Sequence, residues 1–332
     1  MTDAHSVNDQ VVSLIICAYT LDRWQDLCEA VASAQNMTRP PDEIILVCDH
    51  NDELFKKLSA RFSGLCVVAN EEQRGLSGAR NTGVRHAKGQ LMAFLDDDAI
   101  ASREWLSSLT RHFNLPGVYG ATSRIEPLWI GDPPAWMPLE FLWTVGCSYA
   151  GLPIAYSEVR NVMGAAMCFR RDVFDATGGF THRLGRTGTL LPLSCEETEL
   201  SIRAREAISG ATFVFDPSST VQHKIPAKRL SLRYFMLRCY AEGLSKQRLA
   251  GMFRSKTTLS TEAHYVLKTL PRGVLAGFRD AVLRGDAWGL GRAGAIVLGL
   301  AATASGYAAG MCLTITKVAA PLNDSRALDR SA

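Results

Sequence analysis

Three consecutive aspartates, Asp96, Asp97 and Asp98, follow the apolar run Leu91–Leu95. Adjacent carboxylates repel one another, so the group favours a bound cation as its counter-charge. Carboxylate oxygens select Mg²⁺ or Mn²⁺, which are commonly held by one or two carboxylates together with substrate phosphates. The triplet therefore predicts a divalent metal that binds a nucleotide diphosphate. A solvated acidic turn, or aspartates that cap a helix starting near Ser102, is the structural alternative.

A second acidic cluster, Glu196, Glu197 and Glu199, lies much further along the chain and opens an expected helix, Glu196–Ile208. Carboxylates near a helix N-terminus are electrostatically favoured in any case, which explains the cluster equally well when it is taken alone. Its separation from the aspartates suggests two carboxylate sites with different tasks, one for metal and one for proton abstraction.

Four short apolar runs alternate with segments of helical spacing in the N-terminal part of the chain. These runs are Val11–Ala18, Glu43–Cys48, Leu65–Ala69 and Leu91–Leu95. Runs that are apolar throughout are typical of strands covered on both faces, and right-handed crossovers place them in one parallel sheet. Ligands bind such doubly wound α/β sheets beyond the carboxyl ends of the strands. At those ends the chain has Tyr19, Asp49, Asn70 and the three aspartates.

Composition excludes several classes of protein. The chain has 332 residues, of which 47% are hydrophobic and 21% charged, so it is neither disordered nor collagen-like nor a small disulfide-stapled domain. Its nine cysteines include no C-x-x-C pair, which indicates reduced thiols and no zinc site. The formal net charge of +3 conceals a split: residues 1–223 hold 19 Lys and Arg against 27 Asp and Glu, whereas residues 224–332 hold 17 against 6.

Six fragments together resemble the family 2 glycosyltransferases, in order and at plausible spacing over roughly residues 11–225. They are 13–19 (SLIICAY), 45–49 (ILVCD), 78–83 (GARNTG), 93–98 (AFLDDD), 164–171 with Gly179-Phe180, and 196–200 (EETEL). The resemblance implies an α/β fold of the GT-A type, with a Rossmann-like, doubly wound, mostly parallel sheet. It also implies inverting transfer of a sugar from a nucleotide-sugar donor to an acceptor hydroxyl.

The resemblance also implies roles for residues on the donor side of the site. Tyr19 and Asp49 would lie by the base, Arg80 by the nucleotide, and Asp96 and Asp97 by the ribose and phosphates.

The metal and the proton acceptor are implied in the same way. Asp98 would bind Mn²⁺ or Mg²⁺, and His223, expected after a strand Thr212–Phe215, would close the metal site unless it is a structural imidazole. Glu197 stands where the family usually has the aspartate that acts as general base. Because its side chain is one methylene longer, Glu196 remains the second candidate for that role.

The acceptor side is expected in an aromatic, Pro-rich segment. Trp129, Trp136 and Trp143 offer flat faces to a glycan or a lipid-linked acceptor, although ordinary packing explains any single one of them. The polar loop with Gly185, Thr187 and Gly188 is placed to act as a lid over the donor.

The C-terminal region, residues 226–332, is expected to be a mainly helical, basic extension of a glycosyltransferase domain at residues 1–225. Residues 224–256 hold nine Lys and Arg and one acidic residue, and a helix over 228–253 would suit an anionic membrane surface. Residues 293–316 carry no charge; a membrane-lying or packed helix is favoured there over a single span. With no signal peptide recognised at the N-terminus, the expected location is cytoplasmic, peripheral at the inner face of the membrane.

The interpretation is thus a metal-dependent transferase that uses a nucleotide sugar, UDP-linked by preference, in cell-surface polysaccharide or glycolipid synthesis, with no nucleic-acid partner. One alternative is a sugar-nucleotide nucleotidyltransferase, but that class usually has a glycine-rich loop after the first strand, and residues 18–22 (AYTLD) contain no glycine. A non-catalytic membrane-binding protein that uses the basic tail is the other alternative.

Overall fold

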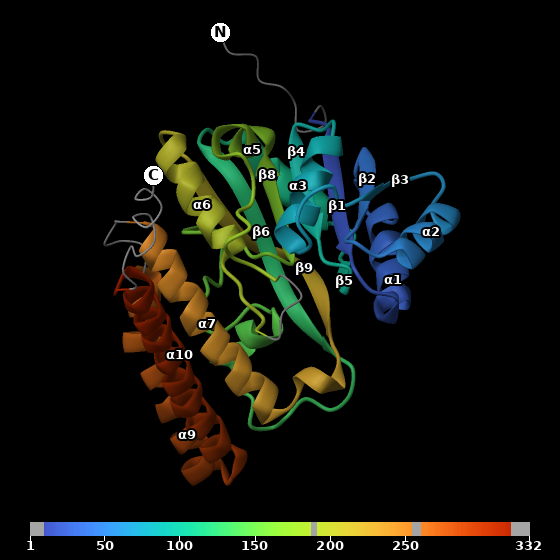
Figure 1. Cartoon of the computed structure of the whole chain (residues 1–332). Coiled ribbons are helices and arrows are strands. Elements are labelled where there is room, and N and C mark those ends of the chain that lie inside the picture. The colour runs from blue at the N-terminus through green and yellow to red at the C-terminus, as the bar shows by residue number, and fades with distance from the viewer. Residues whose placement is uncertain (1–9, 187–190, 254–259, 320–332) are drawn as a thin grey trace, which may run out of the picture.

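The computed structural model describes residues 10–186, 191–253 and 260–319. Nine strands form one sheet in the order β3-β2-β1-β4-β8-β6-β9-β5, and β7 pairs with β9 outside this path (Figure 1). The strands are β1 (Val12–Ala18), β2 (Glu43–Cys48), β3 (Cys66–Ala69), β4 (Leu91–Leu95), β5 (Ala99–Ala101), β6 (Val118–Trp129), β7 (Ser157–Val159), β8 (Ala166–Arg170) and β9 (Thr212–Ile225). All four strands predicted from the apolar runs are present.

The sheet combines a parallel half with a mixed half. Strands β3, β2, β1 and β4 are parallel, as the apolar runs predict, whereas β8 is antiparallel to both β4 and β6. Strand β9 runs parallel to β6 and is ten residues longer than the predicted Thr212–Phe215. His223 therefore lies within this strand, paired with Pro127 and Ala99, and not beyond its end.

Helices cover both faces of the sheet. They are α1 (Trp24–Gln35), α2 (Asp52–Arg61), α3 (Leu76–His86), α4 (Trp105–Thr110), α5 (Arg171–Thr177) and α6 (Glu196–Ala207), with short 3₁₀ turns η1 (Leu21–Arg23), η2 (Arg111–Asn114) and η3 (Leu139–Val145). Because side chains alternate along β1, Leu14 packs with α1, α2 and α4, whereas Ile15 packs with α3, α5 and α6. The two buried cores hold the carboxyl ends of the parallel strands at one edge.

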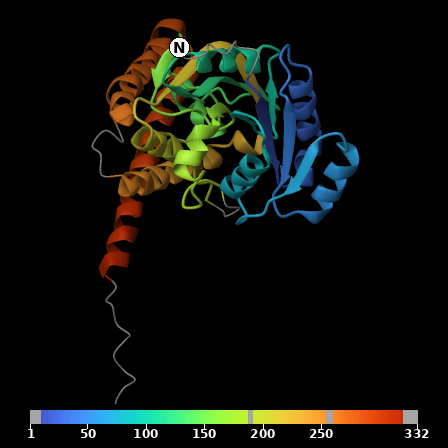
Figure 2. The ribbon, with the colours of Figure 1, turned by 90° about the horizontal axis from the view of Figure 1, so that it is seen from above.

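The C-terminal part is helical. After the turn η4 (Ala227–Arg229) come α7 (Leu232–Met252), α8 (Ser260–His264), the π-helical turn η5 (Tyr265–Thr269), α9 (Leu270–Arg284) and α10 (Trp288–Ala319). These helices lie together on one side of the sheet domain (Figures 1 and 2). Phe235 of α7 and Ile296 of α10 belong to the same core as Phe141 and β1. The end of β9 coincides with the boundary expected at residue 225, but the division into two domains stays a prediction.

Helix α7 is a packed helix and not the surface helix expected from its basic residues. Phe235, Cys239, Leu244 and Leu249 are buried along it, and so is Arg238. Glycines allow α10 to approach it closely: a Cβ added at Gly306 would collide with the backbone carbonyl of Tyr240. Two of its four cations, Arg238 and Lys246, therefore face the interior, while Arg233 and Arg248 are exposed.

We predict opposite effects of two Gly→Ala substitutions in α10. Gly306→Ala should lower the free energy of unfolding by about 1–3 kcal/mol, because the clash is with backbone and only a shift of the helix relieves it. Gly294→Ala meets nothing within 4 Å and should stabilise by up to about 1 kcal/mol through helix propensity. Thermal denaturation of both variants checks this, and equal shifts would contradict the packing of α10 on α7.

Candidate active site

The predicted donor residues lie at the carboxyl edge of the parallel strands. Tyr19 follows β1 and is 48% exposed, while Asp49 follows β2 and is buried. Two hydrogen bonds fix the position of the Asp49 carboxylate, which accepts from Asn70 Nδ2 at 2.7 Å and from the Gly75 backbone N–H at 2.9 Å. The residues after β1, β2, β3 and β4 thus share one edge, as predicted.

Arg80 is a buried side chain that crosses the site from α3. Its guanidinium donates to Glu196 Oε1 at 3.1 Å and to the Gly164 carbonyl at 2.9 Å, and lies 3.5 Å from Asp96 Oδ1. Although burial opposes it, the charges of Glu196 and Asp96 raise the pKa of Arg80. A permanently charged guanidinium therefore links the two acidic clusters.

The chain itself supplies cations for the aspartate triplet. Arg23 of η1 lies 2.7 Å from Asp97 and 3.1 Å from Asp98, and His223 Nε2 lies 3.0 Å from Asp98 Oδ1. Arg229 of η4 approaches Asp98 Oδ2 at 3.6 Å. Sequence reasoning missed Arg23 and Arg229, because no local pattern links them to the aspartates.

Two neighbouring aspartates are shifted in opposite directions. Burial, only partly offset by Arg23, raises the pKa of Asp97 to about 7. Burial acts the same way on Asp98, but His223 and Arg23 outweigh it and hold the pKa of that carboxyl below its usual range. In turn, Asp98 overcomes the effect of burial on His223 and raises the pKa of the imidazole to about 10.

A divalent metal fits the residues at this place. Ligand atoms of Asp96, Asp98 and His223 lie within 4.8 Å of one another. Among the described residues, Asp98 Oδ1 is buried and accepts no well-aligned hydrogen bond, although His223 Nε2 lies 3.0 Å away, and His223 Nδ1 is likewise buried without a hydrogen bond. Two carboxylates and one imidazole form a donor set that Mn²⁺ accepts well. The predicted ligands Asp98 and His223 are thus brought together, and Asp96, which sequence reasoning assigned to the donor, joins them.

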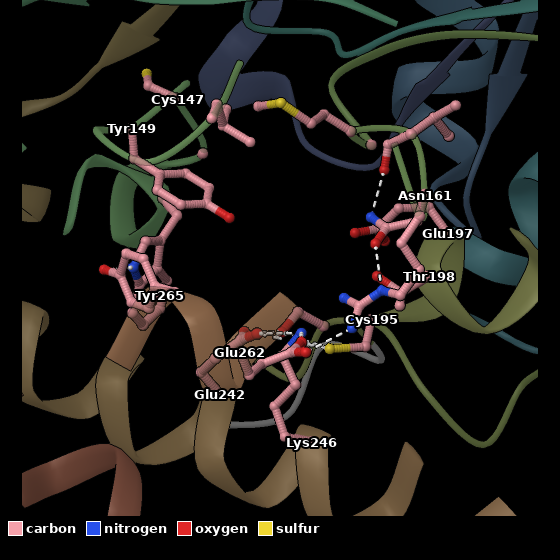
Figure 3. A pocket seen from close by; sticks show the side chains of 18 of the residues that line it. Cys147, Tyr149, Asn161, Cys195, Glu197, Thr198, Glu242, Lys246, Glu262 and Tyr265 are labelled. Carbon is pink, nitrogen blue, oxygen red and sulfur yellow. Dashed lines mark hydrogen bonds and ion pairs between the residues drawn. The ribbon is translucent and has the colours of Figure 1, made fainter. Parts of the chain in front are cut away.

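The two candidate bases on α6 have different surroundings. Both line a cavity, but Glu196 is buried and paired with Arg80, whereas Glu197 is only partly buried in the cavity wall (Figure 3). Burial, followed by the charge of Glu196, raises the pKa of Glu197 to about 8. A carboxylate with a raised pKa that faces a cavity is a better proton acceptor than one neutralised by a guanidinium. The geometry therefore favours Glu197 over Glu196.

This cavity measures about 810 Å³ and joins the candidate metal site to the C-terminal helices. Asp96, Glu197 and His223 line it on the side of the sheet, and residues of α7, η5 and α10 line it on the other. The two acidic clusters therefore share one cavity. A volume of this size holds a drug-sized ligand or several sugar rings.

Only one of the three tryptophans predicted for the acceptor side lines this cavity. Trp143 does so, with its Nε1–H donating to the Tyr265 hydroxyl at 3.1 Å. Trp136 packs edge-on against Phe235, with ring centroids 5.4 Å apart, and Trp129 packs against the core at the end of β6. For Trp129 and Trp136 ordinary packing was the better explanation. Sequence reasoning missed Tyr265, because it lies in the tail.

The predicted lid is described only in part. Gly185 has φ +89°, and a Cβ there would come within 3.2 Å of Glu196 and 3.3 Å of Ser77. Thr187 and Gly188 lie outside the described residues. Gly185 therefore places the start of this loop against the Arg80–Glu196 pair.

Residues 13–178 match the model of the family described as glycosyl transferase family 2. A "glucosyl-dolichyl phosphate glucuronosyltransferase" of Haloferax volcanii is 31% identical over 240 residues, which cover 71% of this chain and 76% of the relative. The "succinoglycan biosynthesis protein ExoM" of Rhizobium meliloti is 25% identical over 72% of this chain and 74% of its own length.

A solved structure shares the fold. The mannosyltransferase PcManGT from Pyrobaculum calidifontis, in complex with GDP-Man and Mn²⁺, superimposes with a TM-score of 0.55 at 17% identity, covering 94% of this chain and 81% of its own. The resemblance and the GT-A fold expected from the six sequence fragments are confirmed. This chain belongs to glycosyl transferase family 2 and is a glycosyltransferase.

Proposed function

We propose that this glycosyltransferase is metal-dependent and inverting, and moves a sugar from a nucleotide-sugar donor to a hydroxyl of a lipid-linked sugar in glycolipid or cell-surface polysaccharide synthesis. The observation that carries the proposal is the shared cavity, which is lined by Glu197 and by Asp96 and His223, two of the three residues of the candidate metal cluster. The relative named for glucosyl-dolichyl phosphate supports a lipid-linked acceptor, and the relative named for succinoglycan supports a role in polysaccharide synthesis.

In the proposed reaction Glu197 is the base. Its carboxylate takes the proton of the acceptor hydroxyl as the oxygen bonds to the anomeric carbon and the bond from that carbon to the diphosphate breaks. Attack from the face opposite the leaving group inverts the anomeric centre. Arg80, held by Glu196 and the Gly164 carbonyl, orients the diphosphate.

Asp98 and His223, with Asp96 beside them, are the residues that would hold the divalent cation. When bound there, Mn²⁺ or Mg²⁺ neutralises charge on the departing diphosphate. Tyr19 and Asp49 remain the proposed contacts of the donor's nucleotide base, because they lie at the ends of β1 and β2. A nucleotidyltransferase and a non-catalytic membrane protein are set aside by the family.

We expect one donor in a panel of UDP- and GDP-sugars to raise the Tm of the protein in the presence of Mn²⁺ and to release its nucleotide. Glu197→Gln should lower turnover about 10²–10⁴-fold and keep the donor-induced stabilisation, because it removes only the proton acceptor. Asp98→Asn should lose the Mn²⁺-dependent stabilisation itself. Normal turnover by Glu197→Gln would refute the assignment of the base.

The raised pKa of Glu197 also has a consequence for stability. The folded chain binds this proton more tightly than the unfolded chain, whose Glu titrates near 4.5. The contribution of Glu197 is therefore fully present below about 4.5 and is lost as the pH rises to about 8.

We thus predict that Glu197→Gln, which cannot ionise, matches the wild type at pH 5 and exceeds its free energy of unfolding at pH 9 by about 1–3 kcal/mol. Urea denaturation at both pH values measures this difference. Glu53→Gln, on the exposed side of α2, is the control and should show no such pH-dependent gain. A less stable Glu197→Gln at pH 9 would contradict the surroundings assigned to this side chain.

The outer face of the C-terminal helices supports a peripheral location at a membrane. Trp288–Leu313 of α10 is long and apolar enough to cross a bilayer, with a mean hydropathy of 1.6, and 28% of it is buried. On α9, Leu275, Phe278 and Val282 are 68%, 51% and 78% exposed. The exposed arginines Arg272, Arg279 and Arg284 lie among them. In this structure α9, and not α7, is the basic amphipathic surface helix.

We expect the purified protein to float with vesicles containing anionic phosphatidylglycerol and less with neutral phosphatidylcholine vesicles. The double variant Leu275→Glu/Val282→Glu should lose most of this binding, because two charges then face the acyl region. Leu115→Glu, at a 46% exposed position on the sheet domain, is the matched control. A protein that ignores lipid altogether would end this proposal, and one that resists carbonate extraction would indicate a span.

A further inference from the structure

A cluster of charged side chains forms the floor of the cavity, away from the metal site. Lys246 Nζ lies 2.7 Å from Glu262 Oε1 and 3.5 Å from Glu242 Oε1, and Arg160 lies 2.5 Å from Glu262 Oε2. All four residues line the cavity, and so does Arg238. Glu242, Lys246 and Glu262 lie between the wall with Glu197 and the opposite wall with Tyr149 and Tyr265 (Figure 3). The proposed reaction uses none of these charges.

These side chains keep their charges. Although burial opposes it, neighbouring acidic groups hold the pKa of Lys246 above its usual value. Burial likewise opposes ionisation of Glu262, but Lys246 and Arg160 lower the pKa of this carboxyl to about 2. Arg160, Arg238 and Lys246 stand against Glu242 and Glu262, so this cluster carries one more positive than negative charge. A partly buried excess of positive charge that faces a cavity favours an anionic ligand.

An apolar wall continues from this floor along α10. Leu300, Ala304, Ala308 and Met311 line the cavity at the spacing of one helix face. Met311 is also 45% exposed, so the wall reaches the protein surface. The surface at that end belongs to α10, the helix whose outer side is proposed above to meet the membrane.

Aromatic rings face this floor from the side opposite Glu197. Tyr149 lies edge-on to Tyr265 with centroids 5.5 Å apart, and the hydroxyl of Tyr265 donates to the Glu140 carbonyl at 2.6 Å. Trp143 donates to the same hydroxyl, so the ring of Tyr265 is fixed. A rigid aromatic surface of this kind suits the apolar face of a sugar ring.

We propose that the cavity is an acceptor chamber for a prenyl-phosphate-linked sugar, in which Lys246 and Arg160 bind the phosphate and the face of α10 from Leu300 to Met311 receives the prenyl chain. This inference rests on the proposed function, since it places the acceptor sugar between Tyr265 and Glu197. It assigns Lys246 of α7 to the substrate and not to the membrane surface.

The test measures binding of farnesyl phosphate, farnesol and inorganic phosphate by calorimetry in detergent, with neither donor nor metal present. The wild type should bind farnesyl phosphate at least about tenfold more tightly than farnesol, because charge-assisted contacts to the phosphate add to the apolar ones. Millimolar inorganic phosphate should not compete, because it lacks the chain. Equal binding of farnesol and farnesyl phosphate, or full competition by inorganic phosphate, would overturn the proposal.

Two variants separate phosphate binding from a structural role, because both break the same Lys246–Glu262 ion pair. Lys246→Met removes a positive charge and should abolish the preference for farnesyl phosphate, whereas Glu262→Gln removes a negative charge and should strengthen it. If the ion pair were merely structural, both variants should bind farnesyl phosphate more weakly than the wild type. Arg248→Met, at an exposed position two residues further along α7, should leave binding unchanged.

Two further measurements keep the outcome readable. Thermal denaturation shows whether Lys246→Met is folded. If it is not, Lys246→Arg should keep the preference for farnesyl phosphate, and an increase or a decrease of that preference in Glu262→Gln still decides the question. If the protein turns over a donor but binds farnesyl phosphate no better than farnesol, the chamber is refuted and the proposed function stands. If it prefers farnesyl phosphate but turns over no donor, the proposed function alone is refuted.

Discussion

The neutralisation of Asp98 is the constraint on which the rest of the site depends. This buried carboxylate lies in the turn between β4 and β5 and meets Arg23 from the N-terminal part, His223 from β9 and Arg229 from the C-terminal part. Burying a carboxylate without partners would cost several kcal/mol of folding free energy, so the fold requires these contacts to compensate the charge. Because they come from three distant parts of the chain, they also fix where the sheet and the helices meet.

The second ion pair, between Arg80 and Glu196, sets the neighbouring edge of the cavity. It joins α3 to the first turn of α6 and neutralises Glu196, one of the two adjacent glutamates that line the cavity. Cys195, which caps the helix, has a φ of 77°. Two adjacent residues of the first turn therefore differ: Glu196 pairs with Arg80, and Glu197 is desolvated beside it. A raised pKa at Glu197 follows from this arrangement.

Sequence patterns predicted the parts of the structure that local physics decides. The apolar runs predicted β1 to β4, and the alternation of strands and helices put Tyr19, Asp49 and Asp96 at one edge. What the patterns could not predict depends on contacts between distant segments. Arg23 and Arg229 have no sequence relation to Asp98.

The same limit applies to the aromatic and basic residues that were interpreted by type alone. By residue type, Trp129 and Trp136 suit a sugar-binding surface and a packed loop equally well. For Trp136 it is the contact with Phe235, from a distant part of the chain, that shows packing. A basic helix on a membrane and a helix that turns Lys246 towards Glu262 have the same composition. For α7 and α9 the distinction depends on which helix packs against the core and which is exposed.

The inward-facing cations of the tail argue that the two halves of the chain make one site. Without residues beyond 225, Asp98 would lose Arg229, the core residue Phe141 would lose Phe235, and the cavity would lose the walls formed by α7, η5 and α10. The sheet half holds the residues proposed for donor binding, metal binding and proton transfer, and the helical half closes the cavity in which we place the acceptor. Charge that looks like an anionic-surface signal in the sequence therefore serves first to join the halves. The surfaces that we propose to meet a membrane are α9 and the outer side of α10.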